Sequence, residues 1–288
     1  MLIDIKSKVK TMLQGEHPSR YIGLGIEYEG VREYRFGDDY RRIDWSITAR
    51  TPPKPSGENP LFIKQYREEK NLNVLLILDQ SGSMEYRNKV LTAVRAALVM
   101  ADLAQRRSDY VGLVCFRDKV ELFLPPARSG EQAYRVLRTL CRSYRTGETS
   151  NLRTMAIEVV RALKRRSIIN LITDINHEVG DYVYFTRLMW ARGHIVNVLL
   201  VADASEISLP NVGWLTLTES EELEKITIDT SEFKNEYDSE IYRLLKGIIS
   251  GCTLFRAKVL LLKSLREVDA KILEIAGLYR LAREGAYR

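Results

Sequence analysis

The stretch from Leu72 to Met84 constrains the fold of this chain more than any other part of the sequence. It reads Leu-Asn-Val-Leu-Leu-Ile-Leu-Asp-Gln-Ser-Gly-Ser-Met, so an apolar run ends in Asp79 and is followed by Ser81 and Ser83. A short apolar run bounded by turn residues predicts a buried central strand of a parallel sheet. Ligands of such sheets bind just beyond the carboxyl ends of the strands. The sequence therefore predicts a carboxylate and two hydroxyls at the edge of the core, and such oxygens suit a hard divalent cation such as Mg²⁺ or Mn²⁺.

Beyond Met84, apolar runs alternate with segments of helical periodicity. Strands alternating with helices predict an α/β fold, with a doubly wound, mostly parallel sheet and helices on both faces. One strand, 110–116, is expected to turn back into a hairpin partner at 119–124. The remaining predicted elements are strands at 168–173 and 195–201 and helices at 88–106, 131–144, 152–165 and 181–192, with Thr149 or Ser150 as the N-cap of the third helix.

These patterns divide the chain into three parts. Residues 1–70 are predicted to be a β-hairpin-rich elaboration, because glycines punctuate short alternating runs there and favour hairpins over helix. Residues 71–205 form the doubly wound domain, and residues 206–288 form a C-terminal α/β extension. In that extension we expect a helix at 231–250 stopped by Gly251, a last strand or a helix within 253–262, and a capping box at Ser264–Glu267 that starts a final helix.

The composition is that of a soluble globular protein, with 45% hydrophobic and 28% charged residues among 288. No apolar stretch approaches the roughly 20 residues of a membrane span, and the N-terminus lacks the apolar core of a signal peptide. These features predict a cytoplasmic protein with no membrane span. The cysteines (115, 141 and 252) and the histidines (17, 177 and 194) are scattered, which argues against a His-built zinc site or a catalytic triad.

Positive charge is concentrated in one region of the chain. Residues 86–166 contain 17 Lys and Arg residues against 7 Asp and Glu residues. Such an excess can mark a nucleic-acid surface or an acidic partner. Much of it lies on predicted amphipathic helices, where solvation explains it, and no aromatic-interleaved basic motif is present. Nucleic-acid binding is therefore kept as an alternative function only.

Two further loops carry oxygen ligands at predicted strand ends. Thr149 precedes the third helix, and Asp174 directly follows the strand at 168–173. In a doubly wound sheet these loops share one edge with the loop after Asp79. The Asp79-x-Ser81-x-Ser83 motif, the threonine and the distant aspartate together resemble the metal-ion-dependent adhesion site of von Willebrand factor A domains.

This resemblance implies a metal site formed by Asp79, Ser81, Ser83, Thr149 and Asp174, in which the two aspartates position the ion directly or through water. The ion would be Mg²⁺, with Mn²⁺ or Ca²⁺ as alternatives, and an Asp or Glu of a protein partner would fill an open coordination position. Whether Glu148 or Ser150 joins the site stays open. The competing interpretation is that the two serines only cap the following helix and that both aspartates only terminate strands.

The N-terminal part supports a narrower resemblance. The segments Gly23-Leu-Gly25-Ile-Glu-Tyr-Glu-Gly30-Val-Arg32, Gly37-Asp38-Asp39-Tyr-Arg41-Arg42-Ile43-Asp44-Trp45 and Thr48-Ala49-Arg50 are similar to the signature of the domain of unknown function 58 family. The similarity covers most of the chain, to about residue 211. It implies an adaptor that works with a MoxR-type AAA+ ATPase in the assembly or remodelling of protein complexes.

The charged and aromatic residues of this N-terminal segment allow two interpretations. Arg32, Trp45 and Arg50 are candidates for a partner-binding surface, because tryptophan and arginine are enriched at binding hot spots. The alternative, which we favour, is an internal ion-pair lattice that joins Asp38 and Asp44 to Arg41 and Arg50.

An enzyme is the main rival class. An aspartate after an apolar strand also begins Mg²⁺-dependent phosphohydrolases that use it as the nucleophile. Such enzymes need a second aspartate two residues later, and here that position is Ser81. No positioned acid or base is evident either. The sequence therefore predicts a non-enzymatic, metal-dependent protein-interaction module.

Overall fold

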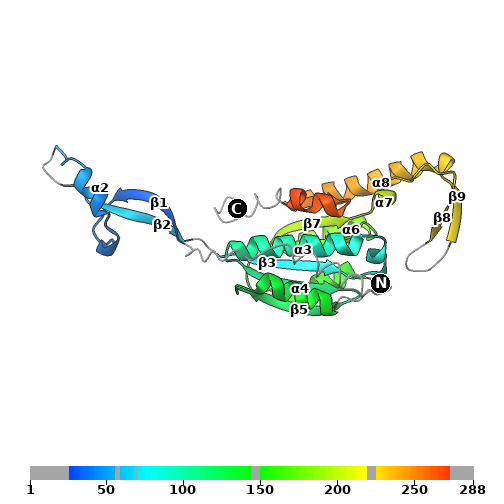
Figure 1. The fold of residues 1–288 in the computed structure, drawn as a ribbon, viewed down its shortest axis with the longest axis horizontal. Coiled ribbons are helices and arrows are strands. Elements are labelled where there is room, and N and C mark those ends of the chain that lie inside the picture. The colour runs from blue at the N-terminus through cyan, green and yellow to red at the C-terminus, as the bar shows by residue number, and fades with distance from the viewer. Residues whose placement is uncertain (1–25, 56–58, 69–70, 144–149, 219–224, 273–288) are drawn as a thin grey trace. The chain divides into compact units, whose positions relative to one another are not determined.

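The computed structural model of this protein describes residues 26–55, 59–68, 71–143, 150–218 and 225–272 (Figure 1). These residues fall into two compact units. Residues 26–68 belong to the smaller unit, and the chain from Asn71 onward belongs to the larger one. Each unit is described below by itself.

The smaller unit is built on one antiparallel pair of strands. Strand β1 (Ile26–Glu33) pairs with β2 (Phe62–Glu68), and the register shifts at Gly30, whose φ of +148° favours glycine. Between them lie a short 3₁₀ helix, η1 (Tyr40–Arg42), and helix α2 (Trp45–Arg50). Asp44 caps the start of helix α2, because its carboxylate accepts hydrogen bonds from the backbone N–H groups of Ser46 and Ile47. The preference for hairpins over helix is therefore wrong at residues 45–50.

The larger unit contains a six-stranded sheet in the order β10-β7-β6-β3-β4-β5. All neighbouring pairs are parallel except β4 and β5, which form the predicted edge hairpin. The mostly parallel, doubly wound α/β fold of the von Willebrand factor A type is thus confirmed. The strands are β3 (Asn73–Asp79), β4 (Tyr110–Phe116), β5 (Val120–Ala127), β6 (Ser167–Thr173), β7 (Ile195–Val201) and β10 (Lys258–Leu262).

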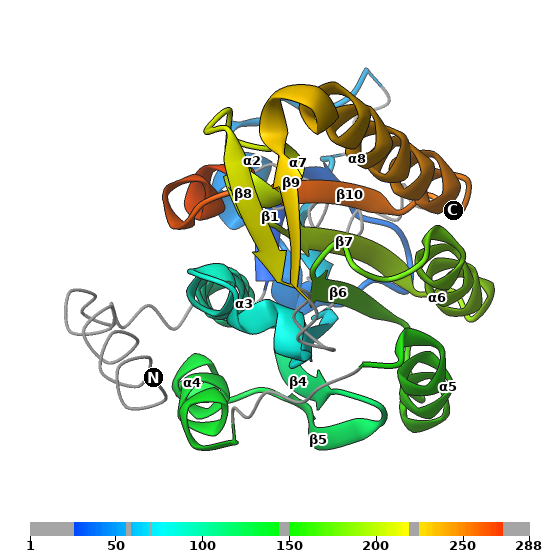
Figure 2. The ribbon, with the colours of Figure 1, turned by 90° about the vertical axis from the view of Figure 1, so that its right-hand side faces the viewer.

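Helices cover both faces of this sheet (Figure 2). Helices α3 (Lys89–Arg106) and α4 (Gln132–Ser143) cover one face, and their apolar residues join alternate residues of the strands in one buried cluster. Helices α5 (Leu152–Ala162) and α6 (Val179–Ala191) share a second cluster on the opposite face with α8 (Thr230–Thr253). Because β3 is buried on both faces, its sequence from Val74 to Leu78 is continuously apolar.

The edge hairpin runs further than the sequence predicts. Strand β5 continues through Pro125 and Pro126 to Ala127, and its register against β4 shifts opposite Gly112. A Cβ atom at Gly112 would lie 2.8 Å from both the Leu124 carbonyl oxygen and the Pro126 nitrogen. Gly112 is therefore required for the close approach of the proline-containing backbone.

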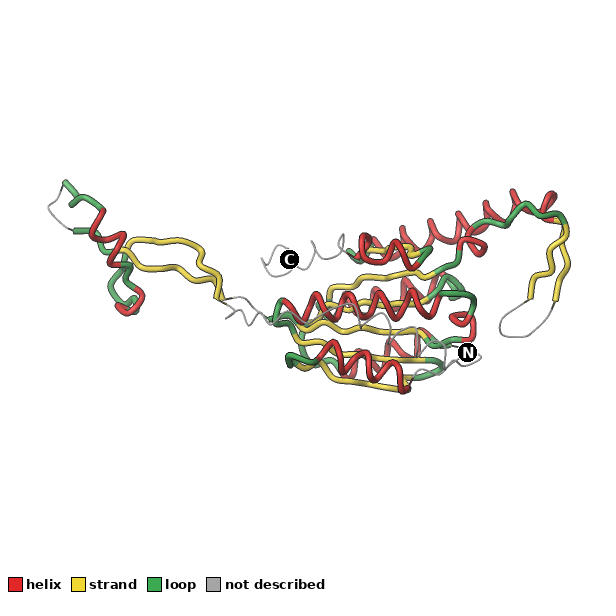
Figure 3. Tube along the Cα trace, in the orientation of Figure 1, coloured by secondary structure: helices red, strands yellow, loops and turns green. Residues whose placement is uncertain are grey.

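The C-terminal region adds a strand and a long helix to the same unit (Figure 3). Helix α7 (Ala204–Ile207) is followed by the hairpin of β8 (Trp214–Thr218) and β9 (Lys225–Asp229). Helix α8 does not stop at Gly251 but continues to Thr253. The open choice for 253–262 resolves into β10, which pairs with β7.

Two other C-terminal predictions differ from the structure. Gly251 is a packing residue, because a Cβ atom there would lie 2.5 Å from a methyl group of Val183 on α6. The predicted capping box is absent, since the Ser264 side chain accepts no capping hydrogen bond before the 3₁₀ helix η3 (Leu265–Glu267). None of the helices in the described ranges is long and apolar enough to cross a membrane.

Candidate metal centre

The predicted site lies where the adjacent strands β3 and β6 end. Asp79 is the last residue of β3, and Asp174 directly follows the last residue of β6. Both carboxylates are almost completely buried, with 0% and 1% of their surfaces exposed. The topology therefore brings together two charged groups that lie 95 residues apart in the sequence, as the argument from strand ends predicts.

The two serines of the first loop face this pair of carboxylates. Their hydroxyl oxygens lie 3.0 Å from each other, and the Ser83 hydroxyl donates a short hydrogen bond to Asp174. The loop continues into the 3₁₀ helix η2 (Gly82–Glu85), at whose N-cap position Ser81 makes no side-chain capping bond. Helix α3 is preceded by Asn88, not by either serine. The interpretation of the serines as helix caps is therefore wrong.

Asp79 is held by several donors at once. Its Oδ1 accepts the Ser81 N–H at 2.8 Å, and its Oδ2 accepts the Thr173 hydroxyl at 2.6 Å. The Nε2 of His177 lies 2.9 Å from the same Oδ2. Burial by itself would raise the pKa of Asp79, but these hydrogen bonds and the charge of His177 outweigh it and hold the pKa below its ordinary value. Asp79 is therefore a carboxylate in a fixed orientation.

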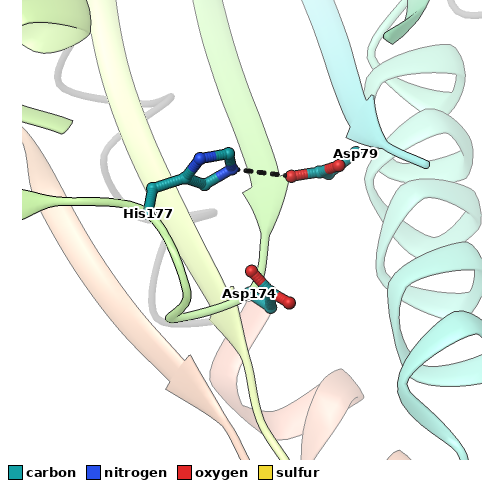
Figure 4. A group of neighbouring side chains, drawn as sticks. All are labelled: Asp79, Asp174 and His177. Atoms are coloured by element: carbon teal, nitrogen blue, oxygen red, sulfur yellow. Dashed lines mark hydrogen bonds and ion pairs between the residues drawn. The ribbon is translucent and has the colours of Figure 1, made fainter. Parts of the chain in front are cut away.

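His177 is a site residue that the sequence analysis missed. One of its ring nitrogens and one carboxylate oxygen each of Asp79 and Asp174 all lie within 4.8 Å of one another, and Figure 4 shows the three side chains. Burial would lower the pKa of His177, but the hydrogen bond to Asp79 and the nearby carboxylates outweigh it and raise the pKa. The signal that could have found it is its position three residues after Asp174, in a loop already expected at the site.

Lys89, the first residue of α3, is a second missed residue. Its ammonium group lies 3.1 Å from Asp174 Oδ2 and 2.7 Å from Glu206 Oε1, and its side chain is 1% exposed. Its charge belongs to the basic region, where solvation was expected to explain most of the charge, and for this residue that interpretation is wrong. A buried lysine needs such partners, since an unpaired buried charge is strongly unfavourable.

The third predicted loop lies only partly within the described residues. Thr149 and Glu148 lie outside them, so their roles as ligands stay predictions. Ser150 is described, and its hydroxyl lies 3.4 Å from Asp79 Oδ2 and 3.3 Å from His177 Nε2. It does not cap α5, because Asn151 accepts the Thr154 N–H in that role. The Ser150 hydroxyl is therefore directed at the candidate metal centre.

The predicted partner-binding residues belong to the smaller unit. Arg32 makes a two-pronged ion pair with Asp38, at 2.7 Å for each contact, which lowers the pKa of Asp38 to about 2. Asp44 caps α2 and lies 3.7 Å from Lys64. The expected pairing of these aspartates with Arg41 and Arg50 is therefore wrong, because other cations take their place. Trp45 and Arg50 have exposed side chains, and their role in partner binding stays a prediction.

The fold and the ligand arrangement together define a von Willebrand factor A-like protein with a candidate site of the adhesion type. Residues 30–243 match the family described as "Protein of unknown function DUF58". This match covers more than half of the chain, and the chain belongs to this family.

Known proteins similar to this chain include the uncharacterized protein Rv1480 of Mycobacterium tuberculosis. It is 28% identical over 226 residues, which are 76% of this chain and 68% of the relative. A structure of a conserved hypothetical protein, BatB, from Bacteroides thetaiotaomicron covers 73% of this chain and 100% of its own, at 18% identity and a TM-score of 0.47. An aerotolerance-related membrane protein from Bacteroides fragilis covers 72% and 99%, at 16% identity and a TM-score of 0.48.

Proposed function

We propose that this chain is a metal-dependent protein-interaction module. A divalent ion would be held by Asp79, Ser81, Ser83 and Asp174, together with Thr149 from the third loop. A carboxylate of a protein partner would complete the coordination of the ion. The proposal concerns binding and includes no catalytic step.

The arrangement of the two serines carries this proposal. Both serines are buried, their hydroxyl oxygens lie 3.0 Å apart, and the Ser83 hydroxyl donates to the buried carboxylate of Asp174. An octahedral ion with bonds of about 2.1 Å places neighbouring ligands roughly 3 Å apart, so the spacing suits two ligands of one ion. The hydroxyls make no helix cap, and the hydrogen bond from Ser83 to Asp174 places its oxygen beside a carboxylate that would bind the same ion.

The charge of the site suits the capture of an acidic group. Asp79 and Asp174 contribute two negative charges, and the ammonium group of Lys89 is shared between Asp174 and Glu206. A bound divalent ion would offset the charges of the two aspartates and present its own positive charge at an open coordination position. Such a centre attracts a further carboxylate, and the low dielectric constant around it strengthens that attraction.

The geometry also supports a binding role over phosphohydrolysis by Asp79. Both oxygens of this carboxylate accept hydrogen bonds, and its exposed fraction is 0%. A nucleophilic carboxylate must itself reach the substrate, whereas in the proposed site the partner reaches the ion and not Asp79. Phosphatase and ATPase assays with Mg²⁺ test this alternative directly, and we expect neither activity above that of Asp79→Ala.

A MoxR-type AAA+ ATPase is the partner that the family resemblance supports. In this proposal the chain acts as an adaptor that links the ATPase to a protein complex under assembly or remodelling. Nucleic acid is not part of the proposal. Within the basic region, Lys89 belongs to the metal centre and Arg106 pairs with Asp102 on the same helix.

The test is affinity capture with purified, tagged protein. Wild type, Asp79→Ala and the double variant Ser81→Ala/Ser83→Ala are compared with and without a chelator, against native extract and against the purified MoxR-type ATPase of the same organism. Asp102→Ala is the matched control, because Asp102 lies partly exposed on α3, where it pairs with Arg106 of the same helix. We expect capture by wild type and the control only, and only with metal. Equal capture by Asp79→Ala, unchanged by chelation, would overturn the proposal.

A further inference from the structure

His177 is held in a fixed position beside the two carboxylates. Its side chain is 9% exposed, and its ring meets the ring of Tyr182 edge to face, with the ring centres 5.7 Å apart. The Tyr182 hydroxyl in turn donates a hydrogen bond of 2.5 Å to the Asp174 carbonyl oxygen. One buried tyrosine therefore holds both the imidazole and the backbone of the second carboxylate.

The distances allow the imidazole nitrogen to be a ligand in its own right. His177 Nε2 and Asp79 Oδ2 lie 2.9 Å apart, close to the roughly 3 Å between neighbouring ligands of an octahedral ion. The group of three ligand atoms spans no more than 4.8 Å, slightly above the roughly 4.2 Å between opposite ligands. A small movement of these side chains brings His177 and Asp79 into contact with one ion, while Asp174 binds it through water, so that one of the six positions stays open for the partner carboxylate.

The hydrogen bond between His177 and Asp79 joins the two atoms that would bind the ion. One hydrogen lies between the two atoms in this contact. An ion that binds Nε2 displaces this hydrogen, which moves to Nδ1 if the ring is neutral and leaves to solvent if the ring is protonated. The contact is part of the same centre as the serine hydroxyls, because Asp79 also accepts the N–H of Ser81.

We infer that His177 is a nitrogen ligand of this centre and that it selects a late first-row divalent ion, such as Zn²⁺ or Co²⁺, over Mg²⁺. The inference rests on the proposed function for the existence of the metal site. Imidazole is a good ligand for zinc, nickel, cobalt and iron, whereas magnesium prefers oxygen ligands and retained water. A site made only of carboxylates and hydroxyls lacks this preference.

The opposing interpretation is that His177 donates its Nε2–H to Asp79 and only orients it. Ligating carboxylates often accept such hydrogen bonds from groups that do not touch the metal. The two interpretations predict different metal affinities for a variant with glutamine at position 177. His177→Gln keeps an N–H donor but removes the aromatic nitrogen ligand.

The test is calorimetric titration of the full chain with Zn²⁺, Co²⁺ and Mg²⁺, one metal at a time. For His177→Gln we expect affinity for Zn²⁺ and Co²⁺ to fall at least about tenfold, and affinity for Mg²⁺ to change less than about threefold. His194→Gln is the matched control, because His194 is a buried histidine whose Nδ1 accepts the Ser167 N–H. An equal loss for all three metals, or no loss for any, would overturn the inference.

A second measurement needs no variant. Pulsed electron paramagnetic resonance of Mn²⁺ bound to the wild-type protein should show coupling to a nitrogen nucleus, and its absence overturns the inference. A nitrogen ligand combined with metal-independent partner capture would contradict the proposed function alone. Metal-dependent capture without nitrogen coupling would contradict only the role of His177. A wild-type protein that binds none of these ions contradicts both.

Discussion

Lys89 Nζ lies 3.1 Å from Asp174 Oδ2, and both side chains are 1% exposed. The lysine therefore supplies a positive charge inside the centre that is proposed to hold a cation. On its other side it pairs with Glu206 of α7, so one ammonium group joins the loop after β6 to the C-terminal region. Removal of the Lys89 charge should therefore change both the charge of the metal centre and the free energy of unfolding.

The first prediction concerns the removal of this charge. Lys89→Met leaves Asp174 buried without its cation, and breaking a buried ion pair in this way costs about 3 kcal/mol of unfolding free energy. A bound divalent ion takes over the missing positive charge, so the metal should stabilise the variant more than the wild type. Urea unfolding with and without the metal measures both effects.

Lys64→Met is the control for this experiment. Lys64 pairs with Asp44 at 3.7 Å but is 41% exposed, so we expect a loss of less than about 1 kcal/mol and no change in the effect of metal. If the metal adds equal stability to wild type and Lys89→Met, the ammonium group does not compete with the ion.

A second prediction concerns the contact between α6 and α8. In Gly251→Ala the new methyl group meets Val183, and overpacking typically costs about 1–3 kcal/mol. The higher helix propensity of alanine offsets about 1 kcal/mol of this. We expect a net loss of about 1 kcal/mol in urea unfolding.

Gly247→Ala is the internal comparison, because its Cβ atom would lie 3.4 Å from the methyl groups of Val179. The higher helix propensity of alanine then outweighs the cost of the contact with Val179, and the unfolding free energy of Gly247→Ala should stay the same or rise. Equal stability of the two alanine variants would show that α8 does not require a glycine at position 251.

A third prediction concerns pH. Burial, followed by the charges of Arg192 and Arg166, lowers the pKa of His194 below its ordinary value near 6.5. The neutral ring also accepts the Ser167 N–H at 3.1 Å. Because the unfolded chain takes up the proton more readily, the stabilising contribution is complete above pH 6.5 and is lost as the pH falls through the folded-state pKa.

We therefore expect the wild type to lose more stability than His194→Gln between pH 7.5 and pH 5. Urea midpoints at the two pH values measure this difference. Parallel losses in both proteins would mean that another group controls the acid sensitivity in this range.

A fourth prediction separates partner binding from stability in the smaller unit. Trp45 is 66% exposed, so Trp45→Ala should change the unfolding free energy by less than about 0.5 kcal/mol. If Trp45 anchors a partner, the same change should weaken capture at least about tenfold, as truncation of a hot-spot residue does. Binding to the purified ATPase and urea unfolding give the two readouts.

Tyr242→Ala provides the comparison, since Tyr242 is an aromatic residue of α8 with 68% exposure. It should change neither quantity. If Trp45→Ala and Tyr242→Ala bind the ATPase with the same affinity, Trp45 is not part of the partner-binding surface.

The sequence predicts the doubly wound sheet because each strand and helix carries its own periodicity. Asp79 and Asp174 could be paired from sequence because strand ends of a parallel sheet share an edge. Lys89 could not, because its partners lie far away in the chain, and a single charged residue does not reveal which side of its helix it faces. His177 lies in a loop that was already expected at the site, but only the structure shows that its ring turns toward Asp79. Gly251 was misread for a related reason: a glycine that stops a helix and one that admits a neighbouring helix look alike in sequence.

The backbone of β5 has a consequence for how partners can reach this domain. Pro125 and Pro126 supply no N–H groups, and the register shift opposite Gly112 bends the strand where they lie. An incoming strand would find missing donors and a distorted ladder along this edge, as in other sheets protected against strand addition. Growth of the sheet by pairing with another chain is therefore disfavoured on the β5 side, and so is aggregation through that edge.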